Sequence, residues 1–205
     1  DYAKAILDTK LSGKIAGILH TINDSLADVV QSDETKILYG NDYFYENLLG
    51  LKFKISAFSF FQTNSKGAEK LYSVVREYAG DTSGKVVFDL YCGTGTIGQI
   101  MSEGSKKVIG IEIVEEAVEA AKINAELNGI TNCEYLVGDM KDVFDDGFTS
   151  RYGRPDVVIT DPPRDGMHKD VVAQLLRLMP QRIVYVSCNS ATQARDLAMM
   201  KDFYE

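Results

Sequence analysis

The pattern of hydrophobic and polar positions changes near residue 57 of the 205-residue chain. Before that point, three partly alternating runs are rich in β-branched and aromatic residues, and turn-forming residues separate them. These runs are Lys14–His20, Thr35–Tyr39 and Leu51–Ile55. Such runs predict short strands, and the pattern also allows a short helix over residues 2–9. Residues 1–56 are therefore expected to be the end of an antiparallel or mixed β-rich domain.

After residue 57 the pattern becomes a regular alternation of strands and helices. The spacing predicts a helix over Ser65–Ala79 with an apolar stripe formed by Ala68, Leu71, Val74, Val75 and Tyr78. Strands are then predicted at Lys85–Leu90, Lys107–Ile113, Cys133–Val137, Asp156–Thr160 and Arg182–Ser187, with helices between and after them. Five strands that alternate with helices predict an α/β fold with a largely parallel, doubly wound sheet.

Such sheets bind ligands outside the carboxyl ends of their strands, and the first of these ends leads into a glycine loop. Gly93, Gly95 and Gly98 fit the G-x-G-x-x-G spacing, which in a dinucleotide enzyme lets a pyrophosphate approach a helix N-terminus. The spacing alone is a weak signal. Asp89, just before this loop, suits a cationic or amine-bearing ligand better than a pyrophosphate.

Carboxylates follow the next two strand ends as well. Glu112 is placed to accept hydrogen bonds from ribose hydroxyls, and Asp139 is placed to accept one from an adenine amino group. S-adenosylmethionine carries a sulfonium and an ammonium, whereas NAD carries two phosphates, so an acidic series favours S-adenosylmethionine. The alternative interpretation is that these acids are solvated or cap helices.

The net charge of −8 argues at first against a nucleic-acid binder. The charge is unevenly distributed, however, because residues 82–163 carry a net −7, residues 1–81 a net −2 and residues 164–205 a net +1. The acidity therefore belongs to the predicted cofactor side. No stretch approaches the roughly 20 apolar residues of a membrane helix. The three cysteines predict neither a disulfide framework nor a metal site, so a cytoplasmic protein is expected.

The fourth strand end contains two consecutive prolines, Pro162 and Pro163, which fix a rigid corner after Asp161. Methyltransferases that act on exocyclic amines place an aromatic residue where this chain has Arg164. Methylation of an amine is therefore disfavoured.

The fifth strand end carries a cysteine in polar surroundings. Cys188 lies between Ser187 and Asn189, which makes it a candidate nucleophile. Cys92 and Cys133 instead fit the usual behaviour of a free cysteine as a small buried hydrophobic residue.

Several stretches together resemble one family, the RNA (uracil-5-)methyltransferases, which form 5-methyluridine in transfer and ribosomal RNA. The stretches are Ser59–Asn64, Asp89–Gly95, Gly110–Glu112, Asn124–Gly129, Asp161–Gly166 and Tyr185–Asn189, followed by Arg195 and Asp196. They occur in the family's order. The resemblance implies a Rossmann-like class I methyltransferase domain over residues 57–205, with residues 1–56 as the C-terminal part of the family's central β-rich domain.

The resemblance also implies a mechanism and a set of residues. A cysteine thiolate, here Cys188, adds to C6 of uracil, so that C5 takes the methyl group of S-adenosylmethionine. Residues implied to bind the cofactor or the uracil are Gln62, Tyr91, Gly93, Gly95, Thr96, Glu112, Asp139 and Asp161. Phe60 or Phe61 is a candidate to stack on a base, and the target base is expected to be flipped out of its stack.

The chain departs from the family's pattern at several points. Ser190 replaces the usual proline after Ser-Cys-Asn and is expected to cap the helix that begins at Ala191. The chain ends at Glu205, before the His-Val-Glu segment that supplies the family's general base, and it lacks the N-terminal TRAM domain and the iron–sulfur cysteine cluster of some members. The resemblance therefore implies a fragment of a longer enzyme.

Three functions are thus under comparison. The preferred one is methylation of uridine C5 in RNA, with 23S ribosomal RNA as the expected target and transfer RNA as the alternative. The second is a cofactor- or RNA-binding fragment without turnover, because the general base is missing. An NAD(P) oxidoreductase is disfavoured, because it leaves the stretches Asp161–Gly166 and Tyr185–Asn189 unexplained.

Overall fold

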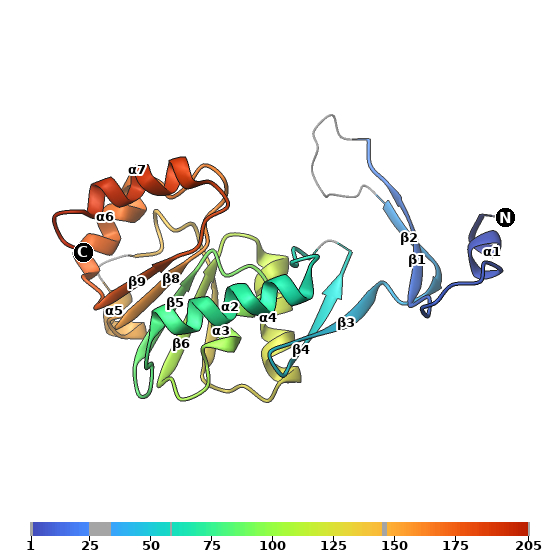
Figure 1. The fold of residues 1–205 in the computed structure, drawn as a ribbon, viewed down its shortest axis with the longest axis horizontal. Coiled ribbons are helices and arrows are strands. Elements are labelled where there is room, and N and C mark those ends of the chain that lie inside the picture. Colours follow the sequence, from blue (N-terminus) through green and yellow to red (C-terminus); the bar gives the residue numbers. More distant parts are fainter. Residues whose placement is uncertain (1, 25–33, 58, 145–146, 205) are drawn as a thin grey trace.

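The computed structural model describes residues 2–24, 34–57, 59–144 and 147–204. These residues form a five-stranded parallel sheet with helices on both faces, preceded by a short helix and two antiparallel strand pairs (Figure 1). Glu205, named above for its position at the chain end, lies outside the described residues.

The predicted elements occur in the predicted order, and the structure adds a strand over Tyr43–Leu48 and a short helix over Phe148–Tyr152 that the sequence did not predict. The N-terminal elements are α1 (Tyr2–Leu7), β1 (Gly17–Ile22), β2 (Glu34–Gly40), β3 (Tyr43–Leu48) and β4 (Leu51–Ser56). The elements of the α/β part are α2 (Ser65–Ala79), β5 (Val86–Leu90), α3 (Thr96–Ile100), β6 (Lys107–Glu112), α4 (Glu115–Leu127), β7 (Cys133–Val137), α5 (Phe148–Tyr152), β8 (Val157–Thr160), α6 (Lys169–Leu178), β9 (Arg182–Tyr185) and α7 (Ser190–Met200).

The large sheet has the strand order β7-β6-β5-β8-β9, and all of its neighbouring strands are parallel. The chain enters the sheet at its central strand, β5, moves outward to β7, and returns to β8 on the other side of β5. The predicted doubly wound α/β fold is therefore confirmed. The direction of winding reverses between β5 and β8, and ligands of such folds bind at this switch point.

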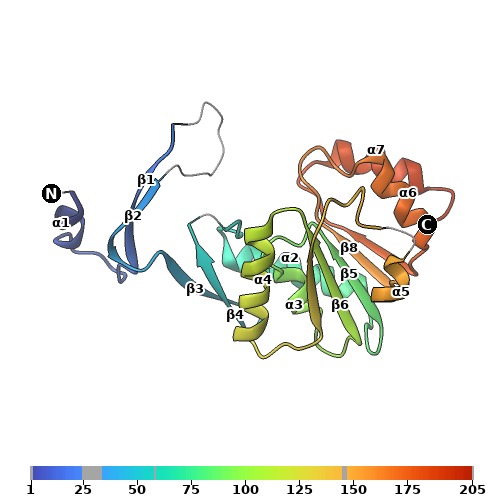
Figure 2. The same ribbon diagram turned by 180° about the vertical axis from the view of Figure 1, so that it is seen from behind.

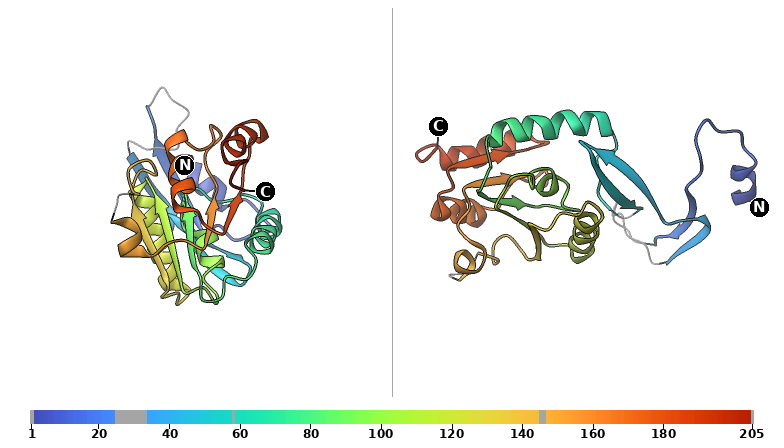
Figure 3. Two further views of the ribbon diagram at one scale, coloured as in Figure 1. Left: turned by 90° about the vertical axis from the view of Figure 1, so that its left-hand side faces the viewer. Right: turned by 90° about the horizontal axis from the view of Figure 1, so that it is seen from below.

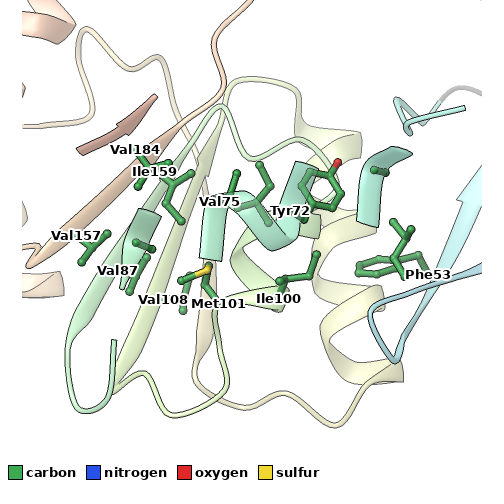
Figure 4. Close-up of a cluster of buried hydrophobic side chains, with 14 of the residues drawn as sticks. Phe53, Tyr72, Val75, Val87, Ile100, Met101, Val108, Val157, Ile159 and Val184 are labelled. Atoms are coloured by element: carbon green, nitrogen blue, oxygen red, sulfur yellow. The ribbon is translucent and has the colours of Figure 1, made fainter. Parts of the chain in front are cut away.

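Each strand of the sheet sends alternate side chains to opposite faces. Val87, Val108 and Val157 join the hydrophobic cluster that packs against α2 and α3, which Figure 4 shows. Phe88 and Ile109 join the cluster on the other face, which packs against α5 and α6. The sheet is thus buried on both sides, as parallel sheets usually are.

The β1–β2 pair and α1 lie at one end of the molecule, away from the parallel sheet (Figures 1 and 2). Their residues are mostly half-buried or exposed. The strands predicted in this region are confirmed to within a few residues, and the short helix allowed over residues 2–9 forms over Tyr2–Leu7.

The β3–β4 hairpin, in contrast, packs into the core of the α/β part. Leu48, Phe53 and Ile55 are buried in the same cluster as α2. The side chain of Asn124 on α4 accepts a hydrogen bond of 2.8 Å from the backbone N–H of Lys54. A residue of α4 thus provides the acceptor for a backbone donor at the free edge of β4. The boundary between residues 56 and 57 stays a prediction, although the hairpin before it shares the core of the domain after it.

The predicted apolar stripe of α2 is wrong in part. The buried residues are Ala68, Tyr72, Val75 and Ala79, whereas Leu71, Val74 and Tyr78 are exposed. Both sets follow a helical period, and packing decides which of the two faces is buried. Figure 3 shows α2 lying along the sheet. The buried face brings Tyr72 to a cavity at the carboxyl ends of the strands.

Candidate active site

A cavity of about 470 Å³ opens at the carboxyl ends of the strands, next to the switch point. Six of the eight residues predicted to bind a cofactor or uracil line it, namely Gln62, Tyr91, Gly93, Thr96, Glu112 and Asp161. Its apolar walls come from Phe60, Phe61, Ile97, Ile113, Val114 and Ala117. Apolar walls with a few convergent polar groups are typical of small-molecule sites.

The glycine loop forms one side of the cavity and connects β5 to α3. Gly95 precedes the first residue of α3 and has a φ of 74°, a left-handed conformation that side chains other than glycine disfavour. A Cβ atom at this position would lie 2.7 Å from the ring of Tyr135. Gly98 permits a second close approach, because a Cβ there would lie 2.9 Å from Oδ2 of Asp89.

Tyr91 begins this loop in a conformation that is uncommon for a non-glycine residue, with a φ of 59°. Such outliers cluster at functional sites, where the surrounding structure holds them in place. Burial, together with the charges of Asp139, Asp196 and Glu112, raises the pKa of the Tyr91 hydroxyl to about 12. Tyr91 therefore remains a neutral hydrogen-bonding group at physiological pH.

Glu112 closes the cavity at the end of β6. Its Oε2 atom accepts a hydrogen bond of 3.0 Å from the N–H of Gly93, and its Oε1 atom accepts bonds from the N–H groups of Ile113 at 2.8 Å and Val114 at 3.0 Å. Three backbone donors thus hold the carboxylate in one orientation. Hydrogen bonds to a carboxylate are stronger than those between neutral groups.

Asp89 lies below the glycine loop and is almost fully buried, with 1% of its surface exposed. Its Oδ2 atom accepts a hydrogen bond of 2.7 Å from the N–H of Gly98, while its Oδ1 atom has no hydrogen-bond partner in the described protein. Burial raises the pKa of Asp89 to about 7. The Gly98 bond lowers this pKa, and the charges of Asp161 and Glu112 raise it.

The carboxyl groups in and beside the cavity have no basic partner among the residues that the structure describes. Burial also raises the pKa of Asp161. Within the described ranges, no lysine or arginine forms an ion pair with Asp89, Glu112 or Asp161. Buried carboxylates without a cation are costly, so the site fits a ligand that supplies positive charge together with hydroxyl donors and an apolar ring.

Two of the predicted residues do not line the cavity. Gly95 acts through the turn into α3, as described above. Asp139 follows β7 and pairs with Lys141, whose Nζ atom lies 3.0 Å from its carboxylate. The hydrogen bonds and charge of Lys141 lower the pKa of Asp139. The charge of Asp139 nevertheless contributes to the raised pKa of Tyr91. The hydrogen bond from an adenine amino group to Asp139 stays a prediction.

The sequence did not point to Tyr72, which reaches the cavity from the buried face of α2. Burial, together with the charges of Asp161 and Asp89, raises the pKa of its hydroxyl to about 12. The helical spacing of Ala68, Tyr72, Val75 and Ala79 could have indicated this buried face. Leu71, Val74 and Tyr78 follow a similar spacing, so the sequence pattern did not separate the two faces.

Cys188 is exposed and follows β9 at the same edge of the sheet. The N–H of Val186 donates a hydrogen bond of 2.9 Å to the carbonyl of Thr160, so the pairing of β8 with β9 extends one residue beyond the strands. Asp161 and Cys188 therefore follow neighbouring parallel strands at the same end.

The other two cysteines differ from Cys188 in their surroundings. Cys92 is buried and Cys133 is half-buried. Burial raises the pKa of the Cys92 thiol well above its usual value and that of Cys133 to about 12. Both therefore remain thiols at neutral pH, as expected for small hydrophobic residues.

The residue that caps α7 is not the predicted one. The helix begins at Ser190, and the Asn189 side chain is its cap, because it accepts a hydrogen bond of 3.1 Å from the N–H of Ala191. Asn189 is among the strongest N-cap types. The loop that bears Cys188 is therefore fixed by the residue directly after it.

The sheet order, the glycine loop and the acidic end of the second strand define a Rossmann-like domain of the class that binds nucleoside cofactors. A family model described as "tRNA (Uracil-5-)-methyltransferase" matches residues 9–205. The chain belongs to this family.

Individual relatives agree with this assignment. An uncharacterized RNA methyltransferase of Clostridium tetani is 54% identical over 98% of the chain and 43% of its own length. The structure of the Pyrococcus abyssi tRNA (uracil-54, C5)-methyltransferase in complex with S-adenosyl-L-homocysteine is 35% identical, with a TM-score of 0.76 over 91% of the chain and 45% of that protein. The chain thus spans less than half the length of these relatives.

A more distant structure supports the fold alone. It comes from Streptococcus mutans, is assigned to the S-adenosylmethionine-dependent methyltransferases, and is 16% identical with a TM-score of 0.62 over 83% of the chain and 50% of its own length. In the part of this chain that the structure describes, no helix is long and apolar enough to cross a membrane. The same residues contain no group of three or more His, Cys, Asp or Glu side chains that can hold a metal ion.

Proposed function

We propose that the full-length protein methylates C5 of a uridine in RNA, with S-adenosylmethionine as the methyl donor. The observation that carries this proposal is the acidic cavity without a cation, which lies at the same sheet edge as the exposed Cys188. The Pyrococcus abyssi relative, a uracil C5 methyltransferase bound to S-adenosylhomocysteine, supports the same combination.

The residues of the cavity match the parts of the cofactor. Glu112, held by three backbone N–H groups, can accept hydrogen bonds from the ribose hydroxyls. Asp161 lines the cavity and Asp89 lies below the glycine loop, so a cationic ligand would favour the ionised form of both, and the apolar walls suit an adenine ring. When bound, S-adenosylmethionine supplies an electrophilic methyl group. NAD, with its two phosphates, fits this negative cavity poorly.

Cys188 is proposed as the nucleophile. Its thiolate adds to C6 of the uracil, and the electron pair of the C5–C6 double bond moves toward C5 and the O4 carbonyl, so that C5 becomes nucleophilic. After C5 is methylated, loss of the C5 proton to a base restores the double bond and expels the Cys188 thiolate.

Phe60 is the better of the two candidates for stacking on the target base. Phe60 lines the cavity and is 76% exposed. The ring of Phe61 instead packs against Phe53 in the core, with 6.0 Å between the two ring centroids. Stacking on aromatic side chains is a common way for proteins to hold an unstacked RNA base. The flipped uracil would lie between Phe60 and the loop of Cys188.

Two RNA classes are candidates for the substrate. Ribosomal RNA is the target expected from the sequence, while the description of the matched family and the Pyrococcus abyssi relative favour transfer RNA. Mass spectrometry of both RNA classes from a deletion strain distinguishes them. We expect one 5-methyluridine to disappear and to return with the wild-type gene but not with a Cys188→Ala gene. Unchanged 5-methyluridine in both classes would contradict the proposed function.

A further inference from the structure

A second buried carboxylate, that of Asp196 on α7, lies outside the cavity and is fully buried. Its Oδ2 atom accepts hydrogen bonds from the Tyr185 hydroxyl at 2.7 Å and from the Met167 N–H at 2.8 Å. Its Oδ1 atom accepts bonds from Nε and Nη2 of Arg195 at 2.9 and 2.7 Å. Both carboxylate oxygens are therefore fully used.

Arg195 lies on α7 itself, but the other two donors belong to the segments that carry the proposed chemistry. Tyr185 is the last residue of β9, three residues before Cys188. Met167 lies near the end of the loop that begins at Asp161 after β8. Asp196 therefore joins the far end of the Asp161 loop to the start of the Cys188 loop.

Further bonds from α7 hold the same loop. Nη2 of Arg195 donates to the carbonyl of Asp165 at 2.8 Å and to that of Met167 at 3.2 Å. The carbonyl of Arg164 accepts a bond of 3.0 Å from the Thr192 hydroxyl. It accepts another, of 3.1 Å, from the side-chain amide of Asn189, the residue after Cys188. The Asp161 loop is thus fixed at its start by the sheet and at its end by α7.

Gly166 allows this close contact between the loop and α7. It has a φ of 75°, and a Cβ atom there would lie 2.6 Å from Oδ2 of Asp196 and 2.7 Å from Nη2 of Arg195. No other residue fits without moving the Arg195–Asp196 pair. A glycine in the Asp161–Gly166 stretch is therefore explained by Asp196 rather than by the cavity.

The hydrogen bonds also determine the charge of Asp196. Burial alone raises its pKa, but the bonds from Tyr185, Met167 and Arg195 outweigh burial and leave the pKa below its usual value. Asp196 is therefore a carboxylate at neutral pH, and its interactions depend on that charge. The first of its partners, Tyr185, has a raised pKa through burial and through this bond.

We propose that Asp196 is a positioning residue, which sets the place of Asp161 relative to Cys188 for the attack on the uracil ring. This inference rests on the proposed function. Asp161 contacts the ligand cavity and Cys188 would contact the base, while Asp196 touches neither and acts through Met167, Tyr185 and Arg195. Misplacing a reacting group by about 1 Å can lower a rate by about a hundredfold.

The test uses Asp196→Asn in the full-length protein, with Asp202→Asn as the matched control. Asp202 follows α7 and is exposed, so its substitution makes the same charge change without touching either loop. The measurements are the rate of covalent adduct formation with RNA that contains 5-fluorouridine, and the affinity for S-adenosylhomocysteine. We expect Asp196→Asn to lower the rate of adduct formation at least about tenfold and to change the affinity for S-adenosylhomocysteine less than about threefold.

Tyr185→Phe provides a second variant if Asp196→Asn does not fold. It removes one donor and leaves the Met167 and Arg195 bonds in place, so a smaller loss of adduct rate, of about threefold to tenfold, is expected. A merely structural role for Asp196 would lower the melting temperature without changing the adduct rate of the folded protein. That result would overturn the inference. If the wild-type protein itself forms no adduct, the proposed function fails instead.

Discussion

The backbone N–H of Gly93 donates a hydrogen bond of 3.0 Å to the side chain of Glu112, which joins the loop after β5 to the end of β6. The glycine loop and the acidic residue of the second strand are usually treated as separate parts of a cofactor site. Here they form one unit, because the Glu112 carboxylate, which would accept hydrogen bonds from the ribose hydroxyls, also fixes the glycine loop beside it.

Replacing Glu112 with glutamine is therefore expected to weaken cofactor binding. An amide replaces one of the two acceptor oxygens with an NH2 group, which faces either the Gly93 N–H or those of Ile113 and Val114, and it removes a charge that favours a cationic ligand. We expect the Kd for S-adenosylhomocysteine, measured by calorimetry, to rise about tenfold or more. Glu116→Gln, an exposed position on α4, should leave the Kd unchanged. Equal Kd values for the two variants would contradict this role of Glu112.

Replacing Gly95 in the glycine loop is expected to lower the free energy of unfolding more than replacing a glycine elsewhere. Gly95 and Gly84 both have positive φ values, of 74° and 69°, but a Cβ atom at Gly84 has no neighbour within 4 Å, whereas one at Gly95 would meet the Tyr135 ring at 2.7 Å. Gly84→Ala should cost about 1 kcal/mol for its backbone conformation. Gly95→Ala should cost about 1–3 kcal/mol more, because the ring must move. Urea unfolding measures the difference, and equal losses would show that the Tyr135 contact is not tight.

The buried Asp89 predicts a specific dependence of stability on pH. Its pKa rises from 3.8 to about 7 on folding, chiefly through burial. Between these values the native state binds more protons than the unfolded state, so the free energy of unfolding falls as the pH rises through this window. The slope for one group is at most about 1.4 kcal/mol per pH unit.

Asp89→Asn should remove this contribution while keeping an oxygen for the Gly98 N–H. We expect the variant to gain stability relative to the wild type as the pH rises from about 4 to about 7, and the difference to level off at higher pH. Urea unfolding of both proteins over this range tests the sign. A difference that does not change with pH would mean that Asp89 ionises as freely in the folded protein as in the unfolded one.

Alkylation should distinguish the three cysteines in the folded protein. Cys188 is exposed, whereas burial raises the pKa of Cys92 and Cys133 and shields them from reagents. Iodoacetamide followed by peptide mass spectrometry should modify Cys188 at least about ten times faster than either of the others. In urea all three should react at similar rates. Faster modification of Cys133 in the folded protein would remove the main physical argument for Cys188.

Much of the architecture follows from local patterns in the sequence. The five parallel strands were predictable because each is a short apolar run followed by turn residues or a helix. β3 was missed because Tyr43–Leu48 does not alternate: three consecutive aromatic residues are followed by Glu46 and Asn47, directly after the turn at Gly40. The five-residue α5 is too short to show a period.

Most of the site residues found by sequence alone lie at the strand ends of the sheet, because the fold class itself brings these positions together; Gln62, before α2, came from the resemblance to the family. Tyr72 and Asp196 were not assigned a role from the sequence. Tyr72 depends on which face of α2 lies on the sheet, and Asp196 depends on how α7 packs against a loop about thirty residues earlier in the chain. Ser190 and Asn189 are both good helix caps, so the backbone conformation of Asn189 decided between them.

The most direct test of the account is a covalent trap of the nucleophile in the full-length protein. RNA that contains 5-fluorouridine should form a denaturation-resistant adduct in the presence of S-adenosylmethionine, because fluorine at C5 cannot be removed as a proton. Peptide mass spectrometry should place the RNA on Cys188, and the adduct should be lost in Cys188→Ala but kept in Cys133→Ala. An adduct that persists in Cys188→Ala, or no adduct from a wild-type protein that binds both the cofactor and the RNA, would contradict the central claim.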